Sequence, residues 1–267
     1  MDQQTLINRI ADALEPDQRI RGLFLSGSFG RGTADEYSDV DLLAVVAPAD
    51  HEAVAADWRG ALEAIVPIVY WNRLPWALVL NAVTDEWLRC DLDIVAPDRL
   101  GRRTQDRLKT LIDRDDILPS LPSTLPVRGI DPAKLQATTN EFIRVLGLLP
   151  VALGRGEIEL MAASGTGFLR RFLTDLLILE MNLPDSGGAL HLSRVLDADR
   201  MALLASIPLP ALTRDSAIEA NLTLARAFFP RAKELYTKLG IQWPETFEAA
   251  TRRRLASVLP PPYSVDW

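Results

Sequence analysis

Short apolar runs alternate with glycine-rich or polar breaks through the N-terminal part of the chain, a pattern typical of strands joined by turns. These runs predict strands at 22–25, 40–47, 66–71, 76–83 and 87–96. Apolar residues at helical spacing predict helices over 4–14, 50–65 and 98–113. The N-terminal part is therefore expected to form a mixed β-sheet flanked by helices.

The pattern changes where prolines gather among small and polar residues, at Pro119, Pro122 and Pro126. Proline removes a backbone donor and blocks regular structure, so we predict a proline-rich linker over 116–131. This linker separates a first domain of residues 1–115 from a second domain of residues 132–267.

Helical periodicity dominates the second domain. One apolar stripe runs through Leu135, Phe142, Leu146 and Leu149. Further helices are expected over 157–183, with a disturbance at Gly165 and Gly167, and over 218–239 and 244–258. The predicted fold class is therefore α+β: a sheet-containing domain followed by an all-α helical-bundle domain.

The composition of the chain indicates the cellular compartment in which the protein is expected. The 267 residues are 48% hydrophobic and 24% charged, with no apolar run long enough to span a bilayer and no secretory signal pattern. A single cysteine, Cys90, excludes an internal disulfide and fits a reducing cytoplasm. We expect a cytoplasmic protein without membrane contact, as a monomer or homodimer.

The formal net charge of −7 argues against a grip on a nucleic-acid polymer, because phosphate neutralisation normally requires a basic surface. A negative field would also attract a cationic small molecule, although it can equally serve solubility alone.

Two carboxylates open one of the predicted strands, in the sequence Asp39-Val40-Asp41. Alternate side chains of a strand share a face, so the two carboxylates lie together, roughly 6–7 Å apart at the backbone. Val40 points into the core. Paired carboxylates repel each other unless a cation lies between them, and oxygen ligands of this kind suit Mg²⁺. Such pairs also occur on solvated strands, so the surrounding sequence must decide between the two interpretations.

A glycine-rich turn, Ser26-Gly27-Ser28-Phe29-Gly30-Arg31-Gly32, precedes the pair. Glycine allows a phosphate to approach the backbone closely, and Ser28 adds a hydroxyl donor. The guanidinium of Arg31 could hold phosphate oxygens. Taken alone, the glycines are equally consistent with an ordinary tight turn.

A later strand carries a third and a fourth carboxylate, in Arg89-Cys90-Asp91-Leu92-Asp93. Asp91 and Asp93 again share a face. If this strand runs antiparallel beside 40–47, it places one of them near the first pair. The other is then a solvated strand residue.

Together these motifs resemble the signature of the DNA polymerase β nucleotidyltransferase superfamily: an apolar residue, Gly-Ser, a spacer, Asp-x-Asp and a further carboxylate on a later strand. The resemblance covers residues 21–97. With a helical C-terminal domain of this size, the chain looks like the bacterial aminoglycoside and lincosamide nucleotidyltransferases. The likeness of the second domain is architectural only.

The resemblance implies Mg²⁺ ligation by Asp39 and Asp41, with Asp91 (preferred) or Asp93 as the third carboxylate. It implies that Gly27, Ser28 and Arg31 contact the triphosphate of a nucleoside triphosphate, with ATP expected. The reaction would transfer AMP to a hydroxyl of a small-molecule acceptor, with antibiotic resistance as its setting.

The resemblance also implies that the acceptor lies between the two domains, with the second domain as the acceptor-binding one. Some relatives use a carboxylate as general base, and we assign Glu141 to that role, although a solvated helix residue would look the same in sequence. Arg170 and Glu180 are weaker candidates.

Two other functions remain open at this stage. Ser26-Gly27-Ser28-Phe29-Gly30 nearly matches a hydrolase nucleophile elbow, but it lacks the first glycine, and a strand is predicted where a helix should follow. The chain could also bind a nucleotide without catalysis, as a regulator or toxin–antitoxin component. The chain has no Walker A motif, and two histidines with one cysteine make zinc catalysis a poor fit.

Overall fold

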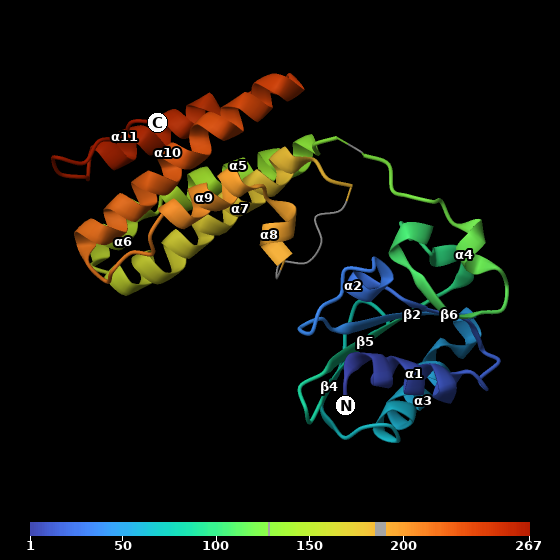
Figure 1. Ribbon diagram of the computed structural model, residues 1–267. Helices are drawn as coiled ribbons and strands as arrows, with labels where there is room; N and C mark the ends of the chain where they lie inside the picture. The colour runs from blue at the N-terminus through green and yellow to red at the C-terminus, as the bar shows by residue number, and fades with distance from the viewer. Residues whose placement is uncertain (128, 185–190) are drawn as a thin grey trace. The chain divides into compact units, whose positions relative to one another are not determined.

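A computed structural model describes residues 1–127, 129–184 and 191–267, and it shows a sheet-containing part followed by a helical part (Figure 1). The two are separate compact units, Met1–Leu125 and Pro126–Trp267, called here the sheet unit and the helical unit. The predicted α+β class, with a mixed sheet first and helices second, is confirmed.

The boundary between the units falls inside the stretch 116–131 that the prolines mark. Its first residues nevertheless belong to the sheet unit. They form the short helix α4 (Ile117–Ser120), whose Ile117 is buried in a cluster of that unit. The Asp113 carboxylate accepts hydrogen bonds from the backbone N–H of Ile117 and Leu118, at 2.8 and 2.9 Å.

Six strands form one sheet in the order β3-β4-β5-β2-β1-β6. Their bounds are β1 (Ile20–Leu25), β2 (Val40–Val46), β3 (Ile68–Arg73), β4 (Val79–Thr84), β5 (Arg89–Val95) and β6 (Lys109–Asp113). Strands β2 and β5 pair in parallel, whereas every other pair is antiparallel. The expectation of an antiparallel strand beside 40–47 that carries Asp91 and Asp93 is therefore wrong. The chain returns to the starting end of the sheet before it forms β5, so β5 runs in the same direction as β2.

Two helices cover one face of the sheet. They are α1 (Gln3–Leu14) and α3 (His51–Glu63), which lie on the same side in Figure 1. Helix α1 begins where the Asp2 carboxylate accepts from the Thr5 N–H at 2.7 Å. The apolar stripes of both helices pack on the alternate strand residues that include Val40 and Cys90. This packing is the main core of the sheet unit.

A smaller apolar cluster covers the opposite face of the sheet. It contains Phe24, Leu43, Val45, Leu108 and Ile117. Figure 1 shows α4 and the short helix α2 (Gly27–Gly30) on this side. The thin cover leaves room on this face for polar side chains of the central strands.

The segment 98–113, expected as a helix, is not one. It contains the 3₁₀ turns η2 (Pro97–Arg99) and η3 (Gln105–Arg107), and it ends in β6. Gly101 has a φ of +62°, which breaks a right-handed helix. Strand β6 then pairs with β1. Tertiary pairing at the sheet edge therefore overrides the helical spacing of the apolar residues.

The helical unit contains a bundle of α-helices. Their bounds are α5 (Pro132–Leu146), α6 (Leu149–Arg155), α7 (Thr166–Met181), α8 (Leu192–Val195), α9 (Ala198–Ser206), α10 (Arg214–Leu239) and α11 (Glu245–Ala256). The predicted disturbance at Gly165 takes the form of a π-helical segment, η4 (Leu160–Gly165), which leads directly into α7.

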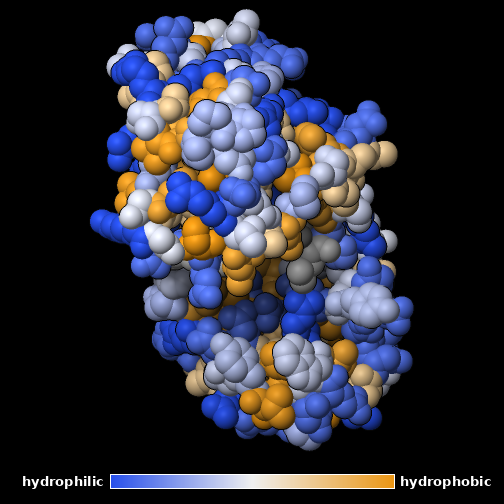
Figure 2. Space-filling model, turned by 90° about the vertical axis from the view of Figure 1, so that its left-hand side faces the viewer, coloured by the Kyte–Doolittle hydropathy of each residue, from blue (hydrophilic) through white to orange (hydrophobic). Residues whose placement is uncertain are grey.

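Aromatic packing ties the bundle together. Phe142 of α5 stacks on Phe228 of α10 with ring centroids 3.8 Å apart, and Phe229 meets Phe142 edge-on at 5.6 Å. On the face seen in Figure 2, apolar residues reach the surface in small groups separated by polar ones. None of the helices within the described ranges is long and apolar enough to cross a membrane.

Candidate functional site

Three neighbouring strands of the sheet bring the predicted site residues together at one end of these strands. Strand β1 ends there, and β2 and β5 begin there, because β1 is antiparallel to β2 whereas β5 is parallel to it. In the parallel register Asp41 lies opposite Asp91, and Leu43 lies opposite Asp93. Asp41, Asp91 and Asp93 therefore share the thinly covered face, since their neighbours Val40 and Cys90 point into the main core.

Gly27 is in direct contact with the Asp41 carboxylate. The residue has a φ of +55°, in the left-handed region that favours glycine. A Cβ built on Gly27 would overlap the Asp41 carboxylate oxygen Oδ2, far inside van der Waals contact. The Ser26 N–H also donates to the Asp41 backbone oxygen at 2.8 Å. The glycine turn and the Asp-x-Asp strand are thus fitted to each other at one point.

Ser28 lies one residue further on, in α2. Its hydroxyl oxygen is buried and has no hydrogen-bond partner among the described residues. The Thr33 N–H donates to the Ser28 backbone oxygen at 2.9 Å, which holds the turn closed. An unpaired buried hydroxyl is costly unless a ligand completes it. The short α2 and the following β2 also differ from the strand, turn and long helix of a hydrolase nucleophile elbow.

Arg31 closes the same turn and is exposed. Its positive charge acts on Asp41, where it opposes the rise in the carboxyl's pKa. Gly30, one residue before it, packs against the backbone oxygen of Arg107 so closely that a Cβ would clash. The turn is therefore held on both sides, by Asp41 and by η3.

Asp41 has the most perturbed carboxyl of the group. Burial raises its pKa to about 6, and the negative charges of Asp39 and Asp91 add to the rise. Arg31 and Arg89 act in the opposite direction without cancelling it. The negative charge of these carboxylates is only partly balanced by the two arginines. Such an arrangement indicates a site that can bind an additional cation.

Each neighbouring carboxylate has its own partner. Asp39 Oδ2 lies 3.3 Å from Nη1 of Arg89. Burial raises the pKa of Asp91, while a hydrogen bond from Asn81, its partner across β4 and β5, lowers it.

Asp93 lies two residues further along β5, and its carboxylate has a different partner. Its Oδ2 accepts a 2.6 Å hydrogen bond from Nη2 of Arg103, and this arginine lowers a carboxyl pKa that burial raises. Asp93 is therefore in a closed ion pair, whereas Asp91 directly faces Asp41.

Across residues 1–127, 129–184 and 191–267, no three His, Cys, Asp or Glu side chains lie close enough to hold a metal ion as a group. Asp39, Asp41 and Asp91 are near enough to perturb one another, but Arg89 and Asn81 engage two of the three. The donor set still has the oxygen-rich chemistry that Mg²⁺ takes.

Sequence reasoning did not assign roles to Arg89 and Asn81. Arg89 lies in the quoted segment Arg89-Cys90-Asp91-Leu92-Asp93, and its position two residues before a strand carboxylate was the available signal. Asn81 carries no signal in sequence, because its contact with Asp91 depends on the register of β4 against β5.

Glu141 lies elsewhere, on α5 of the helical unit. Its carboxylate accepts from Nε and Nη2 of Arg144 at 3.0 and 2.8 Å, and this pairing lowers its pKa. The weaker candidates are structural. Arg170 donates to the backbone oxygens of Ile207 and Leu204, and Glu180 is nearly buried between Arg200 and Arg231.

Residues 7–100 match the family model described as a nucleotidyltransferase domain. The matched range contains the glycine turn and all four strand carboxylates. The sheet unit is therefore a polymerase β-like nucleotidyltransferase domain. No curated protein matches the sequence at a significant level.

Solved structures resemble the chain only loosely. An aminoglycoside 6-adenyltransferase from Bacillus subtilis is 15% identical over 96% of this chain and 98% of that one, with a TM-score of 0.42. A nucleotidyltransferase-like protein from Exiguobacterium sibiricum is 15% identical, over 96% and 89%, with a TM-score of 0.36. A Thermotoga maritima CCA-adding enzyme complexed with tRNA is 13% identical, over 96% and 71%, with a TM-score of 0.37. Likeness at this level carries no argument about the substrate.

Proposed function

We propose that the protein is a Mg²⁺-dependent nucleotidyltransferase that transfers AMP from ATP to a hydroxyl of a small-molecule acceptor and releases pyrophosphate. One observation carries this proposal: the left-handed Gly27 turn lies directly against the carboxylate of Asp41, which pairs across the parallel strands with Asp91. The contact joins a phosphate-binding type of turn to a carboxylate pair, which is the combination that nucleotidyl transfer requires.

Asp39, Asp41 and Asp91 are the proposed metal ligands. A divalent ion bound there would neutralise phosphate charge and help the pyrophosphate to leave. The same ion would relieve the repulsion that raises the pKa of Asp41. Asp93 was the other candidate for the third carboxylate, but its ion pair with Arg103 favours a supporting role.

The turn is the proposed triphosphate site. Gly27 lets the turn lie directly against the Asp41 carboxylate, and Ser28 offers a buried hydroxyl that has no hydrogen-bond partner among the described residues. Arg31, exposed at the end of α2, supplies positive charge next to the carboxylates. These groups orient the triphosphate, and orientation with charge neutralisation is the main contribution a protein makes to such a reaction.

The helical unit is the proposed acceptor-binding part, with Glu141 as the proposed base that takes the acceptor's proton. Arg144 lowers the pKa of this carboxyl and so weakens it as a base. Glu141 can accept a proton efficiently only if the ion pair opens when the acceptor binds. An aminoglycoside-like or lincosamide-like compound is the acceptor class we propose at this level.

Calorimetric titration of ATP, with and without Mg²⁺, tests the nucleotide site. We expect Mg²⁺-dependent binding in the native protein and at least a tenfold loss in Asp41→Ala. Asp98→Ala, which removes an exposed carboxylate from η2, is the matched control and should bind as the native protein does. Binding that is independent of metal and unaffected by Asp41→Ala would contradict the proposal.

Transfer itself is measured as pyrophosphate release from ATP with a panel of aminoglycosides and lincosamides. Activity that survives Asp41→Ala would refute the assigned site.

A further inference from the structure

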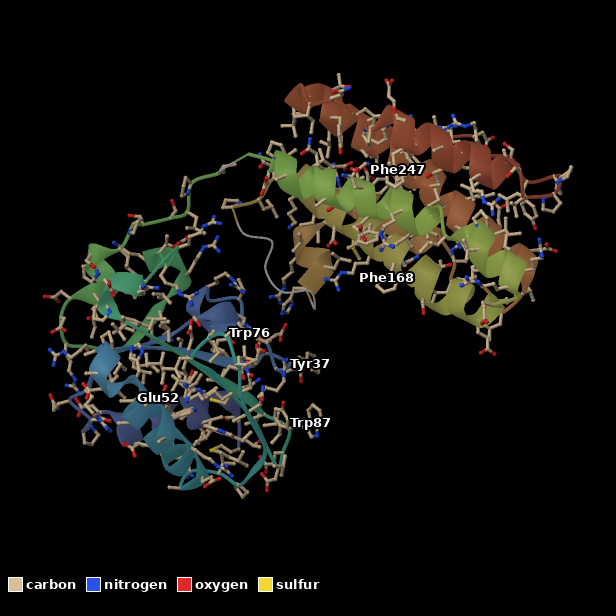
Figure 3. The ribbon with its side chains drawn as sticks, turned by 180° about the vertical axis from the view of Figure 1, so that it is seen from behind. Tyr37, Glu52, Trp76, Trp87, Phe168 and Phe247 are labelled. Atoms are coloured by element: carbon tan, nitrogen blue, oxygen red, sulfur yellow. The ribbon has the colours of Figure 1, made fainter. Side chains whose placement is uncertain are left out.

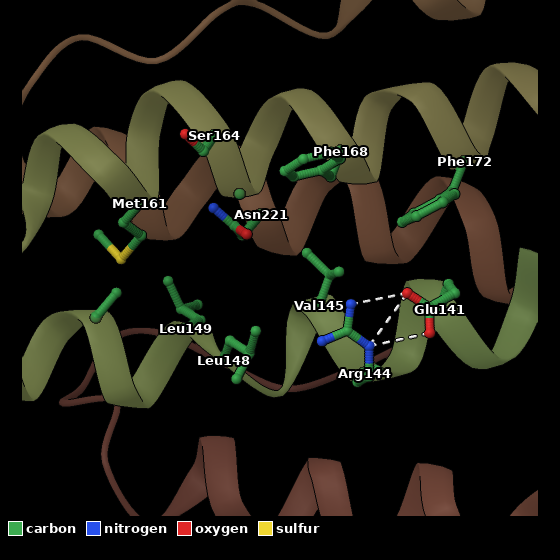
Figure 4. A pocket seen from close by; sticks show the side chains of 12 residues that line it. Glu141, Arg144, Val145, Leu148, Leu149, Met161, Ser164, Phe168, Phe172 and Asn221 are labelled. Atoms are coloured by element: carbon green, nitrogen blue, oxygen red, sulfur yellow. Dashed lines mark hydrogen bonds and ion pairs between the residues drawn. The ribbon is translucent and has the colours of Figure 1, made fainter. Parts of the chain in front are cut away.

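The helical unit contains a cavity of about 310 Å³. Residues of α5, α6, η4, α7 and α10 line it, and Figure 4 shows their side chains converging from facing helices. Its volume is at the lower end of the range of small-molecule sites, about 300–1,000 Å³. An apolar cavity of about 150 Å³ holds one benzene ring, so this one has room for a body of about two rings.

Backbone geometry creates the space. The π-helical segment η4 ends at Gly165, and the Thr166 N–H bonds back to the Met161 oxygen five residues earlier. Segments of this type are frequent at functional sites because they displace side chains from the α-helical register. A Cβ at Gly165 would meet no atom within 4 Å, so this residue leaves the cavity open.

Apolar side chains make most of the wall. Leu149 and Met161 are buried at its base, while Phe168 and Leu148 are 55% and 48% exposed at its mouth. Figure 3 marks Phe168 on the helical unit, and Figure 4 shows its ring beside α7, across from Val145 and Leu148. A half-exposed aromatic ring beside an apolar cavity offers a surface on which a ligand ring can pack.

One buried polar group faces this apolar space. Asn221 of α10 is 2% exposed and lines the cavity. Its Nδ2 donates to Thr166 Oγ1 at 3.1 Å and to the Ala217 backbone oxygen at 2.8 Å. Both amide hydrogens are therefore used, so a ligand that reaches this side chain would bond to it by donating a hydrogen to the side-chain oxygen.

Charge at the mouth is balanced. Glu141 and Arg144 stand there as an ion pair, with a 2.8 Å contact. A site for a polycation would need several uncompensated carboxylates, and this cavity has one carboxylate that is already paired. The cavity therefore suits a neutral or singly charged ligand, and of the two acceptor classes proposed above it favours the lincosamide-like one over the polycationic aminoglycosides.

We propose that this cavity binds a small, largely apolar molecule of about two rings that carries a hydroxyl or ammonium donor, and that this molecule is the acceptor of the transfer reaction. The donor bonds to Asn221 Oδ1 while the apolar body packs between Phe168 and Leu149. The first half of this inference stands on the cavity alone, and the second half rests on the proposed function.

Binding of 2-naphthol, measured by calorimetry without nucleotide or Mg²⁺, tests the first half. We expect saturable one-to-one binding to the native protein. We expect about tenfold weaker binding of 2-methoxynaphthalene, because its methyl group replaces the donated hydrogen. Gly165→Leu should weaken 2-naphthol binding at least tenfold, since the leucine occupies the cavity.

Gly167→Leu is the matched control, because Gly167 lies two residues further on, in the first turn of α7, has open space at its Cβ and does not line the cavity. It should bind 2-naphthol as the native protein does, and the thermal midpoints of both variants show that each is folded. Absence of saturable binding, equal affinity for the two naphthalenes, or equal loss in both leucine variants would overturn the site.

The second half has its own readout. 2-Naphthol should inhibit pyrophosphate release competitively with the acceptor in the native protein and fail to do so in Gly165→Leu. Binding without inhibition would refute the acceptor assignment while leaving the nucleotide site intact. Loss of Mg²⁺-dependent ATP binding in Asp41→Ala tests the proposed function separately.

Discussion

Replacing Asp41 with asparagine should stabilise the metal-free sheet unit. Burial and the charges of Asp39 and Asp91 raise the pKa of Asp41 from an ordinary value of 3.8 to about 6. Each tenfold change in proton affinity corresponds to about 1.4 kcal/mol, so the ionised carboxylate costs up to about 3 kcal/mol of folding free energy at neutral pH. Asparagine keeps the shape without the charge, and we expect a gain of about 1–3 kcal/mol.

The sign of the pH dependence follows from linkage. A carboxyl with a higher pKa in the folded than in the unfolded chain takes up protons preferentially when folded, so its contribution to stability falls as pH rises from about 4 to about 6. The Asp41→Asn variant lacks this contribution. The difference in stability between the variant and the native protein should therefore grow over that interval and stay constant above it.

Cys90 provides an assay specific to the sheet unit. It is the single cysteine of the chain and is buried in β5, so a thiol reagent reaches it only when this unit opens. Labelling with a pyridyl disulfide, which also reacts at acid pH, measures the free energy of that opening against urea concentration. At neutral pH we expect labelling of Asp41→Asn to be about ten- to a hundredfold slower than that of the native protein. Equal or faster labelling, or a stability difference that does not change with pH, would refute this account of the site's charge.

Two further variants test the geometry of the site. Gly27→Ala should weaken Mg²⁺-dependent ATP binding at least tenfold, because the new Cβ displaces the carboxylate of Asp41, whereas Gly32→Ala has the same type of backbone at φ +68° with open space and should bind normally. Equal losses in calorimetry would attribute the effect to backbone strain alone, about 1–2 kcal/mol. Asp91→Asn should abolish pyrophosphate release, while Asp93→Asn should retain measurable release with a lower thermal midpoint, since Asp93 serves an ion pair. The reverse order would reassign the third carboxylate.

Apolar patterning predicted the strands of the sheet well because each central strand has a fully buried face. Asp39 and Asp41 could be placed on one face from the strand repeat alone. Their alignment with Asp91 could not, because the direction of β5 depends on the crossover through α3 and on the β3–β4 pair between. The local sequence of β5 does not determine this direction.

The same limit explains the other differences. The segment 98–113 has apolar residues at helical spacing, yet its last residues complete the sheet beside β1. Gly27 was recognised as part of a turn, but its contact with Asp41 appears only when β1 and β2 are paired. The contacts of Asn81 with Asp91 and of Arg103 with Asp93 could not be predicted for the same reason, since each partner reaches its carboxylate from another segment of the fold.

The π-helical segment makes the helical unit sensitive to chain length in one short interval. Its backbone closes from Thr166 to Met161, one residue further than in an α-helix. Deleting a single residue from 160–165 would remove the extra residue and let the segment return to regular α-helix, while the chain on either side keeps nearly the same helical phase. The wide turn between Met161 and Thr166, which forms part of the cavity wall, would close. A one-residue deletion here is therefore compatible with an intact bundle but not with the cavity, so the loss or gain of one residue in related chains would mark a change in what the helical unit can hold.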